Sequence, residues 1–546
     1  MNMIQLAIAF ALAAPGATTL AQDEILFEGV GPHTRPIVTN SDTARRFFNQ
    51  GLNFLFAFNH KEARRSFRAA ARHDPECAMA WWGIATANGP HINFGHVDPS
   101  EEKEAYDALR KALAVMADEP AADQALIRAA VKRFADPQPK DRSPLDRAYA
   151  QAMADVYRRF PDDGDVGSLY AESLMDLQPW DLWTHDGKPK GNTLLIVRTL
   201  EEVMERHPRH PFALHLYVHA IEASNNPAKA VPAADRLRDL TPALGHNQHM
   251  PSHIDIRVGD WEKAIVANQK AIKADKAYRE KRPEQFIYRV YMAHNHHMLS
   301  LAAMMTGQRD LALHHIDTMC AEMPPGFLSV AAPVVDGFFA MPYEVRVRFG
   351  MWDEVLALPE PSEQFPLTRA LRRAARAVSF AAKGMTREAR AEQSLFYVAR
   401  AAVPAEATFG NNTAAAILKV GHHLMNGEIL VAEGKEDAAL RELRLAVAAE
   451  DALRYDEPPD WILPSRHVLG AALMKMGRYQ EATAVYGEDL KRNPNNGWSL
   501  YGMSDALQRL GRHDEAARYQ ALFKDIWAHA DIQIDSSCLC IPGKRR

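Results

Sequence analysis

Residues 44–75 read ARRFFNQGLNFLFAFNHKEARRSFRAAARHDP. Counted from Ala44, a glycine stands at position eight (Gly51), a phenylalanine at position twenty-four (Phe67) and a proline at position thirty-two (Pro75). Small residues let two antiparallel helices touch, large residues fill the space beside the contact, and proline ends the second helix. The stretch therefore predicts a helix–turn–helix unit of about 34 residues.

The same pattern recurs along the chain. A glycine followed by polar or acidic residues marks the expected turn between two helices at Gly259, Gly307, Gly350, Gly384, Gly434, Gly477 and Gly511. The chain thereby resembles the tetratricopeptide-repeat (TPR) family over roughly residues 44–530. The resemblance implies an all-α, right-handed α-solenoid of TPR helix hairpins. It also implies that the first helix of each unit lines a concave face, where family members bind peptides or partner proteins.

The expected organisation has seven segments. They are a signal peptide (1–21), an N-terminal extension (22–43), TPR units (44–99), an irregular helical segment (100–210), TPR units with a histidine array (211–320), C-terminal TPR units (321–530) and a tail with a C-x-C motif (531–546).

The N-terminus predicts export. An apolar run from Ile4 to Ala14 is followed by small residues that end at Ala21, as in a secretory signal peptide. No later run approaches the roughly 18 apolar residues of a membrane span. We therefore expect a periplasmic or secreted protein without a membrane span.

Charge and cysteine content narrow the functional classes. The net charge is −5, with 64 Lys and Arg against 69 Asp and Glu, so a nucleic-acid partner is not expected. Four cysteines in 546 residues do not form a disulfide framework. The pairing of Cys77, Cys320, Cys538 and Cys540 stays open, and the last two either form a disulfide or bind a soft metal.

Histidines gather on equivalent repeat positions. Twelve of the 23 histidines lie between residues 207 and 315. In three neighbouring units, ligand-type residues occupy positions two, five, nine and twelve of the first helix: His215, His219 and Glu222, then His249 and His253, then His294 and His297. Spacings of three and four place such residues on one stripe of a helix.

This stripe predicts a metal site. Neighbouring helices pack about 8–10 Å apart, so imidazoles from separate units can meet at one ion. Imidazole and carboxylate are ligands for divalent transition metals, with copper or iron favoured here and zinc possible. We expect His215, His219, His253 and His297 as the main ligands. His249, His294 and Glu222 are the next candidates.

Other residues receive roles from their positions. Glu172, at position nine of a looser unit, and Glu222 are candidate catalytic carboxylates. His91, in a Gly/Pro-containing loop, and Glu344, at position nine of its unit, are candidate substrate contacts. Pro251 fits only the first turn of a helix, so we expect a helix to start near it and leave His249 in the preceding loop.

The preferred hypothesis is an exported TPR metalloprotein that acts as a metal-dependent enzyme, with an oxidoreductase favoured over a hydrolase. The chain is also similar to secreted bacterial TPR proteins with a histidine-rich central segment. Two alternatives stay open: a non-catalytic TPR scaffold that binds a peptide or partner protein, and a periplasmic metal carrier. In each case the expected partner is a small-molecule or peptide ligand in the concave groove.

Overall fold

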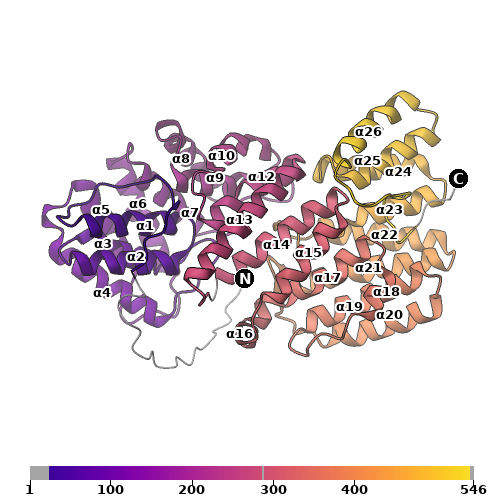
Figure 1. Cartoon of the computed structure of the whole chain (residues 1–546), viewed down its shortest axis with the longest axis horizontal. Helices are drawn as coiled ribbons and strands as arrows, with labels where there is room; N and C mark the ends of the chain where they lie inside the picture. The colour runs from indigo at the N-terminus through magenta and orange to yellow at the C-terminus, as the bar shows by residue number, and fades with distance from the viewer. Residues whose placement is uncertain (1–23, 286–287, 542–546) are drawn as a thin grey trace. The chain divides into compact units, whose positions relative to one another are not determined.

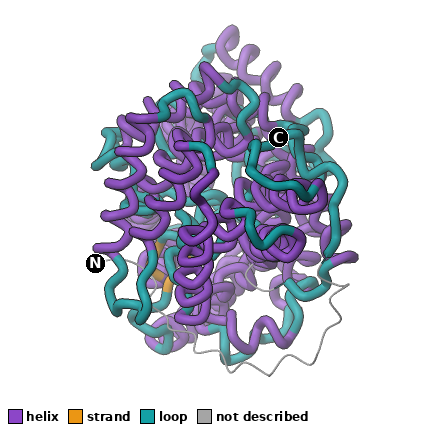
Figure 2. The backbone as a smooth tube through the Cα atoms, turned by 90° about the vertical axis from the view of Figure 1, so that its left-hand side faces the viewer, coloured by secondary structure: helices purple, strands orange, loops and turns teal. Residues whose placement is uncertain are grey.

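The computed structural model describes residues 24–285 and 288–541. Helices and their connecting loops make up this part of the chain apart from one short hairpin (Figures 1 and 2). The chain forms two compact units. The first contains the residues up to Ile254 together with Lys270–Glu284, and the second contains Asp255–Gln269 together with the residues from Gln285 onward. The predicted signal peptide lies outside the described residues.

The first unit holds the N-terminal helices. They are α1 (Asp42–Phe56), α2 (His60–His73), α3 (Ala78–Thr86), α4 (Pro99–Val115), η2 (Met116–Asp118), α5 (Ala121–Ala130), η3 (Val131–Arg133), α6 (Ser143–Arg159), α7 (Gly164–Met175), α8 (Thr193–Arg206), α9 (Pro211–Glu222), η4 (Pro227–Ala230), α10 (Val231–Leu237) and α11 (Gly245–His249). The chain passes between the units within α12 (Pro251–Val258) and within α13 (Trp261–Lys281).

The second unit holds the remaining elements. They are α14 (Tyr288–Met305), α15 (Arg309–Ala321), α16 (Pro325–Val335), η5 (Asp336–Ala340), α17 (Met341–Arg348), α18 (Trp352–Ala357), α19 (Pro366–Ala382), α20 (Thr386–Ala401), β1 (Thr408–Phe409), β2 (Asn412–Thr413), α21 (Ala414–Ala432), α22 (Glu436–Asp451), α23 (Ser465–Lys475), α24 (Tyr479–Arg492), α25 (Gly497–Arg509) and α26 (His513–Ile526).

Consecutive helices pack as hairpins, as the sequence predicts. Helices α1 and α2 form the first pair, and Phe67 of α2 fills the space against Gly51 of α1 and Gly83 of α3. A β-carbon added at Gly51 or Gly83 would lie 2.8 Å or 2.4 Å from the Phe67 ring. These contacts confirm the small/aromatic pairing of the repeat and the all-α solenoid of TPR helix hairpins.

The turn glycines also behave as predicted. The seven glycines identified from the sequence all have φ between 67° and 81°. Side chains are strained in this left-handed region, and glycine adopts it readily. Each of these glycines therefore reverses the chain between two helices.

Contrary to the expectation from the sequence, one stretch of the second unit has the length and composition of a membrane span. Pro325–Arg348 has a mean hydropathy of 1.2 in its most apolar window, and 56% of that window is buried inside the protein. The stretch is divided into α16, η5 and α17, and the Asp336 carboxylate in its middle accepts backbone hydrogen bonds from Leu367 and Thr368. These features fit a core element of the second unit.

The tail contains a disulfide. Cys538 and Cys540 are bonded to each other, whereas Cys77 and Cys320 carry free thiols. The disulfide alternative for the C-x-C motif is therefore the one that the structure contains. Ser537 next to it donates a hydrogen bond to the carbonyl of His467, which ties the tail to α23.

Candidate metal centre

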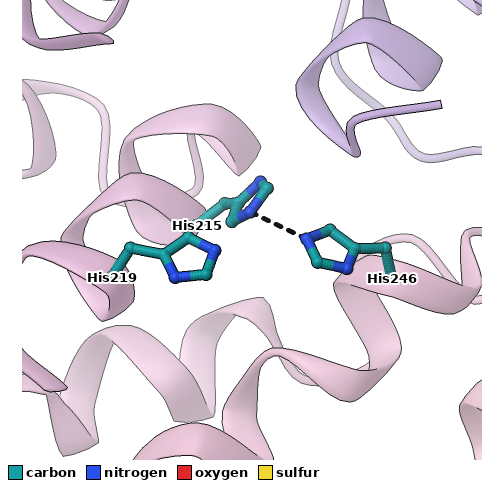
Figure 3. A group of neighbouring side chains, drawn as sticks. All are labelled: His215, His219 and His246. Carbon is teal, nitrogen blue, oxygen red and sulfur yellow. Dashed lines mark hydrogen bonds between the residues drawn. The ribbon is translucent and has the colours of Figure 1, made fainter. Parts of the chain in front are cut away.

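Helices α9 and α11 of the first unit bring three imidazoles together (Figure 3). His215 and His219 lie one turn apart on α9, and His246 points toward them from α11. One ligand nitrogen from each lies within 4.8 Å of the other two. A second group with the same spacing joins His219 to Glu222 and His253. We call these five residues the buried histidine cluster.

Hydrogen bonds fix the protons of three of these rings. His215 Nδ1 donates to the Phe56 carbonyl at 2.8 Å. His219 Nδ1 donates to Glu222 Oε1 at 2.9 Å, and His253 Nδ1 donates to Glu222 Oε2 at 2.5 Å. A carbonyl or carboxylate oxygen can only accept, so each Nδ1 carries the proton and each Nε2 keeps its lone pair.

These lone pairs are placed as metal ligands require. His219 Nε2 is buried and has no hydrogen-bond partner within the described chain. His215 Nε2 and His246 Nε2 face each other at 3.2 Å. Two nitrogens on one tetrahedral zinc ion, each about 2.0–2.1 Å from it, lie about 3.3 Å apart. The donor set therefore fits a divalent transition metal.

The cluster is closed to water. The side chains of its five residues are between 0% and 4% exposed. Burial, and then the neighbouring imidazoles, lower the pKa values of His215, His219 and His246 well below the ordinary value. Neutral imidazole is the form that binds metals, so the burial keeps these rings ready for ligation.

Pro251 divides the helix that carries the other histidines. It begins α12, where its missing N–H is not needed, and α11 ends just before it. The prediction that His249 lies in a loop is wrong, because α11 runs through Gly245–His249. His249 Nε2 lies 2.6 Å from His253 Nε2, so these two rings face each other across the break.

Phe58 forms an aromatic platform under the cluster. Its ring centroid lies 4.4 Å from His215, 5.6 Å from His246 and 6.3 Å from His219. It also stacks on His91 at 4.6 Å. Phe58 has φ of 55°, a strained backbone conformation for a side chain of this size. The turn between α1 and α2 thus directs a large apolar ring among the imidazoles.

Two loops contribute residues beside this platform. Trp180 lies edge-on to His219 at 5.3 Å, and its Nε1 donates to Asn93 Oδ1 at 3.1 Å. Asn93 belongs to the loop that carries His91, and His91 itself is buried next to His60, with ring centroids 4.4 Å apart. The candidate substrate contact His91 therefore packs against Phe58, the same ring that contacts His215, His219 and His246.

The other predicted carboxylate of the first unit has different partners. Glu172 is buried in α7, and burial raises its pKa to about 7 against the opposing charge of Arg133. Arg133 donates to Asp176 at 2.6 Å. Glu172 is thus part of the surroundings of this arginine, and no candidate ligand group among the described residues includes it.

Three predicted residues belong to the second unit. His294 and His297 lie on α14, and Glu344 lies on α17. His297 is buried with its ring edge against Phe338, and burial lowers its pKa to about 3. Burial raises the pKa of Glu344 to about 8. Metal ligation by His294 and His297 and substrate contact by Glu344 stay predictions. None of these three residues belongs to the buried histidine cluster as defined above.

From the sequence, His246 is only a mobile alternative to His249 and stands outside the expected set of ligands. The sequence pattern did include this residue, because His246 occupies position two of its repeat, as His294 does in its own repeat. Phe58 and Trp180 gave no comparable signal. Both have a positive φ, which depends on turn geometry that a residue pattern does not reveal.

A further histidine group in this unit has structural partners. Asp165 accepts hydrogen bonds from His33 and His210 at 2.8 Å and 2.9 Å, and Arg35 donates to its other oxygen at 2.9 Å. His210 also accepts a hydrogen bond from Ala213 N at the start of α9. These bonds tie the N-terminal segment to the start of α9.

Comparisons with known proteins found solved structures of low similarity. A scan of family models and a search of curated proteins both found no match. Among solved structures, the human IFIT1 dimer with m7Gppp-AAAA is similar over 90% of this chain and 92% of that chain, at 13% identity and a TM-score of 0.34. The APC/C hetero-tetramer Cut9–Hcn1 is similar over 91% of this chain and 79% of that chain, at 12% identity and a TM-score of 0.30.

Similarity at this level says nothing about what this chain binds. The architecture stands on the helix hairpins and turn glycines of the chain itself. Together, fold and site define an all-α solenoid protein of the TPR type that contains a buried cluster of imidazoles in its first unit.

Proposed function

We propose that this chain is an exported TPR metalloprotein that binds a divalent transition metal at the buried histidine cluster and acts as a metal-dependent enzyme. The observation that carries the proposal is the set of fixed Nε2 lone pairs. His215, His219 and His253 each have Nδ1 tied to an oxygen that can only accept, and His219 Nε2 has no partner within the described residues.

The donor set suits several metals. Imidazoles bind copper, iron and zinc, and we favour copper or iron because the chain is proposed to be exported and methionines such as Met250 accompany the histidines. Copper or iron would supply redox chemistry and zinc would supply an activated water, so an oxidoreductase is favoured over a hydrolase.

The residues around the cluster support this chemistry. Both oxygens of Glu222 already accept imidazole protons, so its role is to orient His219 and His253 and to hold their Nδ1 protons. Phe58 and Trp180 exclude water from the rings. His91 contacts Phe58 and is our candidate for contact with a small-molecule or peptide substrate.

Export is part of the proposal. It rests on the apolar and small-residue pattern of the first 21 residues, which lie outside the described chain. The disulfide between Cys538 and Cys540 is compatible with an oxidising compartment, where such bonds persist. The proposed location is therefore the periplasm or the extracellular medium.

The burial of the cluster also suits two other candidate functions. Ligands that are at most 4% exposed would also suit a closed metal site in a carrier or in a non-catalytic scaffold. An enzyme must also admit a substrate to these buried side chains. Turnover and metal transfer separate these candidates, since a carrier gives up its metal to a competing apo-protein and converts nothing.

The test is metal analysis of the full chain purified without an affinity tag. We expect about one ion per chain that survives dialysis, and its loss in His219→Ala with the helical circular dichroism unchanged. His185→Ala, at an exposed histidine of the same unit, is the matched control and should keep the metal. Metal-free protein from every metal-supplemented growth would refute the proposal.

A further inference from the structure

Two adjacent histidines of the second unit meet a carboxylate on the next helix. His422 and His423 lie on α21 and Glu442 lies on α22. One ligand atom from each of the three residues lies within 4.8 Å of the other two. His423 Nδ1 donates to Glu442 Oε2 at 2.8 Å, and the two imidazole centroids are 4.7 Å apart. We call these residues the half-exposed histidine cluster.

The repeat hairpin sets this geometry. Helices α21 and α22 form one repeat hairpin, joined by a turn in which Gly434 has φ of 72°. Gly427 lets them approach closely, because a β-carbon there would lie 2.5 Å from Leu443. Glu442, next to Leu443, is thereby held against α21. The meeting of the three side chains thus follows from the packing of a rigid hairpin.

One ring nitrogen of His422, Nδ1, has no hydrogen-bond partner among the described residues. The Asn426 amide donates to His422 Nε2 at 3.3 Å, and Asn426 Oδ1 accepts from Gln393 at 2.5 Å, which orients the amide. A neutral His422 must therefore carry its proton on Nδ1. This atom is buried and has no hydrogen-bond acceptor in the described chain.

Protonating the ring does not remove the problem. An imidazolium keeps the Nδ1–H without an acceptor and turns Nε2 into a second donor, which then faces the donating Asn426 amide. A buried N–H without an acceptor costs about 1–3 kcal/mol. A metal ion bound to Nδ1 replaces that proton and removes the unsatisfied donor.

We propose that His422, His423 and Glu442 form a second divalent metal site, one that exchanges its ion with solvent. Two imidazoles and one carboxylate are the ligands of open zinc and iron sites. The side chains of His423 and Glu442 are 14% and 26% exposed, so an ion can reach them without any rearrangement of the fold. This site is independent of the proposed function, because it uses no residue of the buried histidine cluster.

The experiment measures Zn²⁺ binding in a variant whose buried histidine cluster has lost three of its imidazoles. Full-length, untagged His215→Ala/His219→Ala/His246→Ala protein is stripped of metal and titrated with Zn²⁺ by calorimetry. We expect one remaining site, weakened about 10-fold or more by His423→Ala or Glu442→Gln. His513→Ala, at an exposed histidine of the same unit, should leave the titration unchanged.

The same question can be asked without the triple background if that protein does not fold. Wild-type protein and the His423→Ala variant are both reconstituted with Co²⁺. The His423→Ala variant should absorb less than the wild type and should keep the part of the absorption that depends on His219. A background protein that binds no Zn²⁺, or an affinity indifferent to both His423→Ala and Glu442→Gln, would overturn the second site. Either result leaves the wild-type metal content as a separate test of the buried cluster.

Discussion

The two histidine clusters differ in how firmly their ligands are held. In the buried cluster, three imidazoles are oriented by hydrogen bonds from Nδ1 to the Phe56 carbonyl and to Glu222. In the half-exposed cluster, only His423 has such a carboxylate partner. Ligands that are already oriented lose little freedom when an ion binds. The comparison predicts tight, slowly exchanging metal in the first unit and weaker, faster exchange in the second.

Two buried glutamates show the same contrast. Glu222 lies between two imidazoles, and both of its oxygens accept protons. Glu428 of α21 is also buried, but neither of its oxygens has a hydrogen-bond partner in the described residues. Burial raises the pKa of Glu428 to about 8. Burial without donors thus keeps the Glu428 carboxyl protonated at neutral pH, whereas Glu222 accepts from two imidazoles.

Removing one ligand should have the largest effect. His219 belongs to both ligand groups of the buried cluster, so His219→Ala should weaken metal binding by more than about 100-fold, beyond the range of outer-shell changes. Competition with a chromogenic chelator measures the affinity. His423→Ala should leave this tight site intact. An equal loss in the two variants would remove the distinction between the clusters.

Removing the orienting carboxylate should have a smaller effect. Glu222→Gln can accept from only one of His219 and His253 through its remaining oxygen. Metal affinity should then fall by about 10–100-fold, as for other outer-shell partners. The chelator competition reads out this change, with Glu205→Gln on the neighbouring α8 as the control. Unchanged affinity in Glu222→Gln would show that the Nδ1 hydrogen bonds do not organise the site.

The buried carboxyl of Glu428 should make the free energy of unfolding depend on pH. Glu428 has a folded pKa of about 8, whereas an unfolded glutamate titrates near 4.3. Between these values the unfolded chain releases the proton and the folded chain keeps it, so the free energy of unfolding falls as pH rises toward 8. Glu428→Gln should remove this fall, by a difference on the order of 3–4 kcal/mol between pH 5 and pH 8.

Urea denaturation at the two pH values measures this difference. Glu406→Gln, at an exposed glutamate of the same unit, should reproduce the wild-type dependence. If Glu428→Gln also reproduces it, the carboxyl of Glu428 has a partner or reaches water in solution.

Removing the hydrogen bond between Trp180 and Asn93 should have the smallest effect. Trp180→Phe removes the donor to Asn93 but keeps an aromatic ring beside His219. A net hydrogen bond is worth about 0.5–1.5 kcal/mol, so release of the ion to a chelator should accelerate by about 2- to 10-fold. Stopped-flow mixing with the chelator measures the rate. A rate equal to that of the wild type would mean that ions leave the buried cluster by another route.

The sequence predicted the parts of the structure that follow from periodicity. The turn glycines, the Gly51–Phe67 contact and the meeting of His215 with His219 all follow from the repeat spacing. His249 was misplaced because a proline can begin a new helix directly after a short one, and Pro251 does so. The sequence contained His246 at an equivalent repeat position, but residue spacing alone did not rank it above its neighbours.

The remaining parts of the site depend on tertiary contacts. Phe58 reaches the imidazoles through a strained turn, and Trp180 reaches His219 from a loop that is distant in sequence. The carbonyl of Phe56 orients His215 across 159 residues of sequence. No local pattern encodes such pairings, since they arise only when separate repeats pack together.

The most direct test of the account is anomalous X-ray diffraction from crystals of untagged protein grown with its native metal. The account predicts an anomalous peak about 2.0–2.1 Å from the Nε2 atoms of His215, His219 and His246. Crystals with a metal bound elsewhere and no peak within coordinating distance of these nitrogens would contradict it.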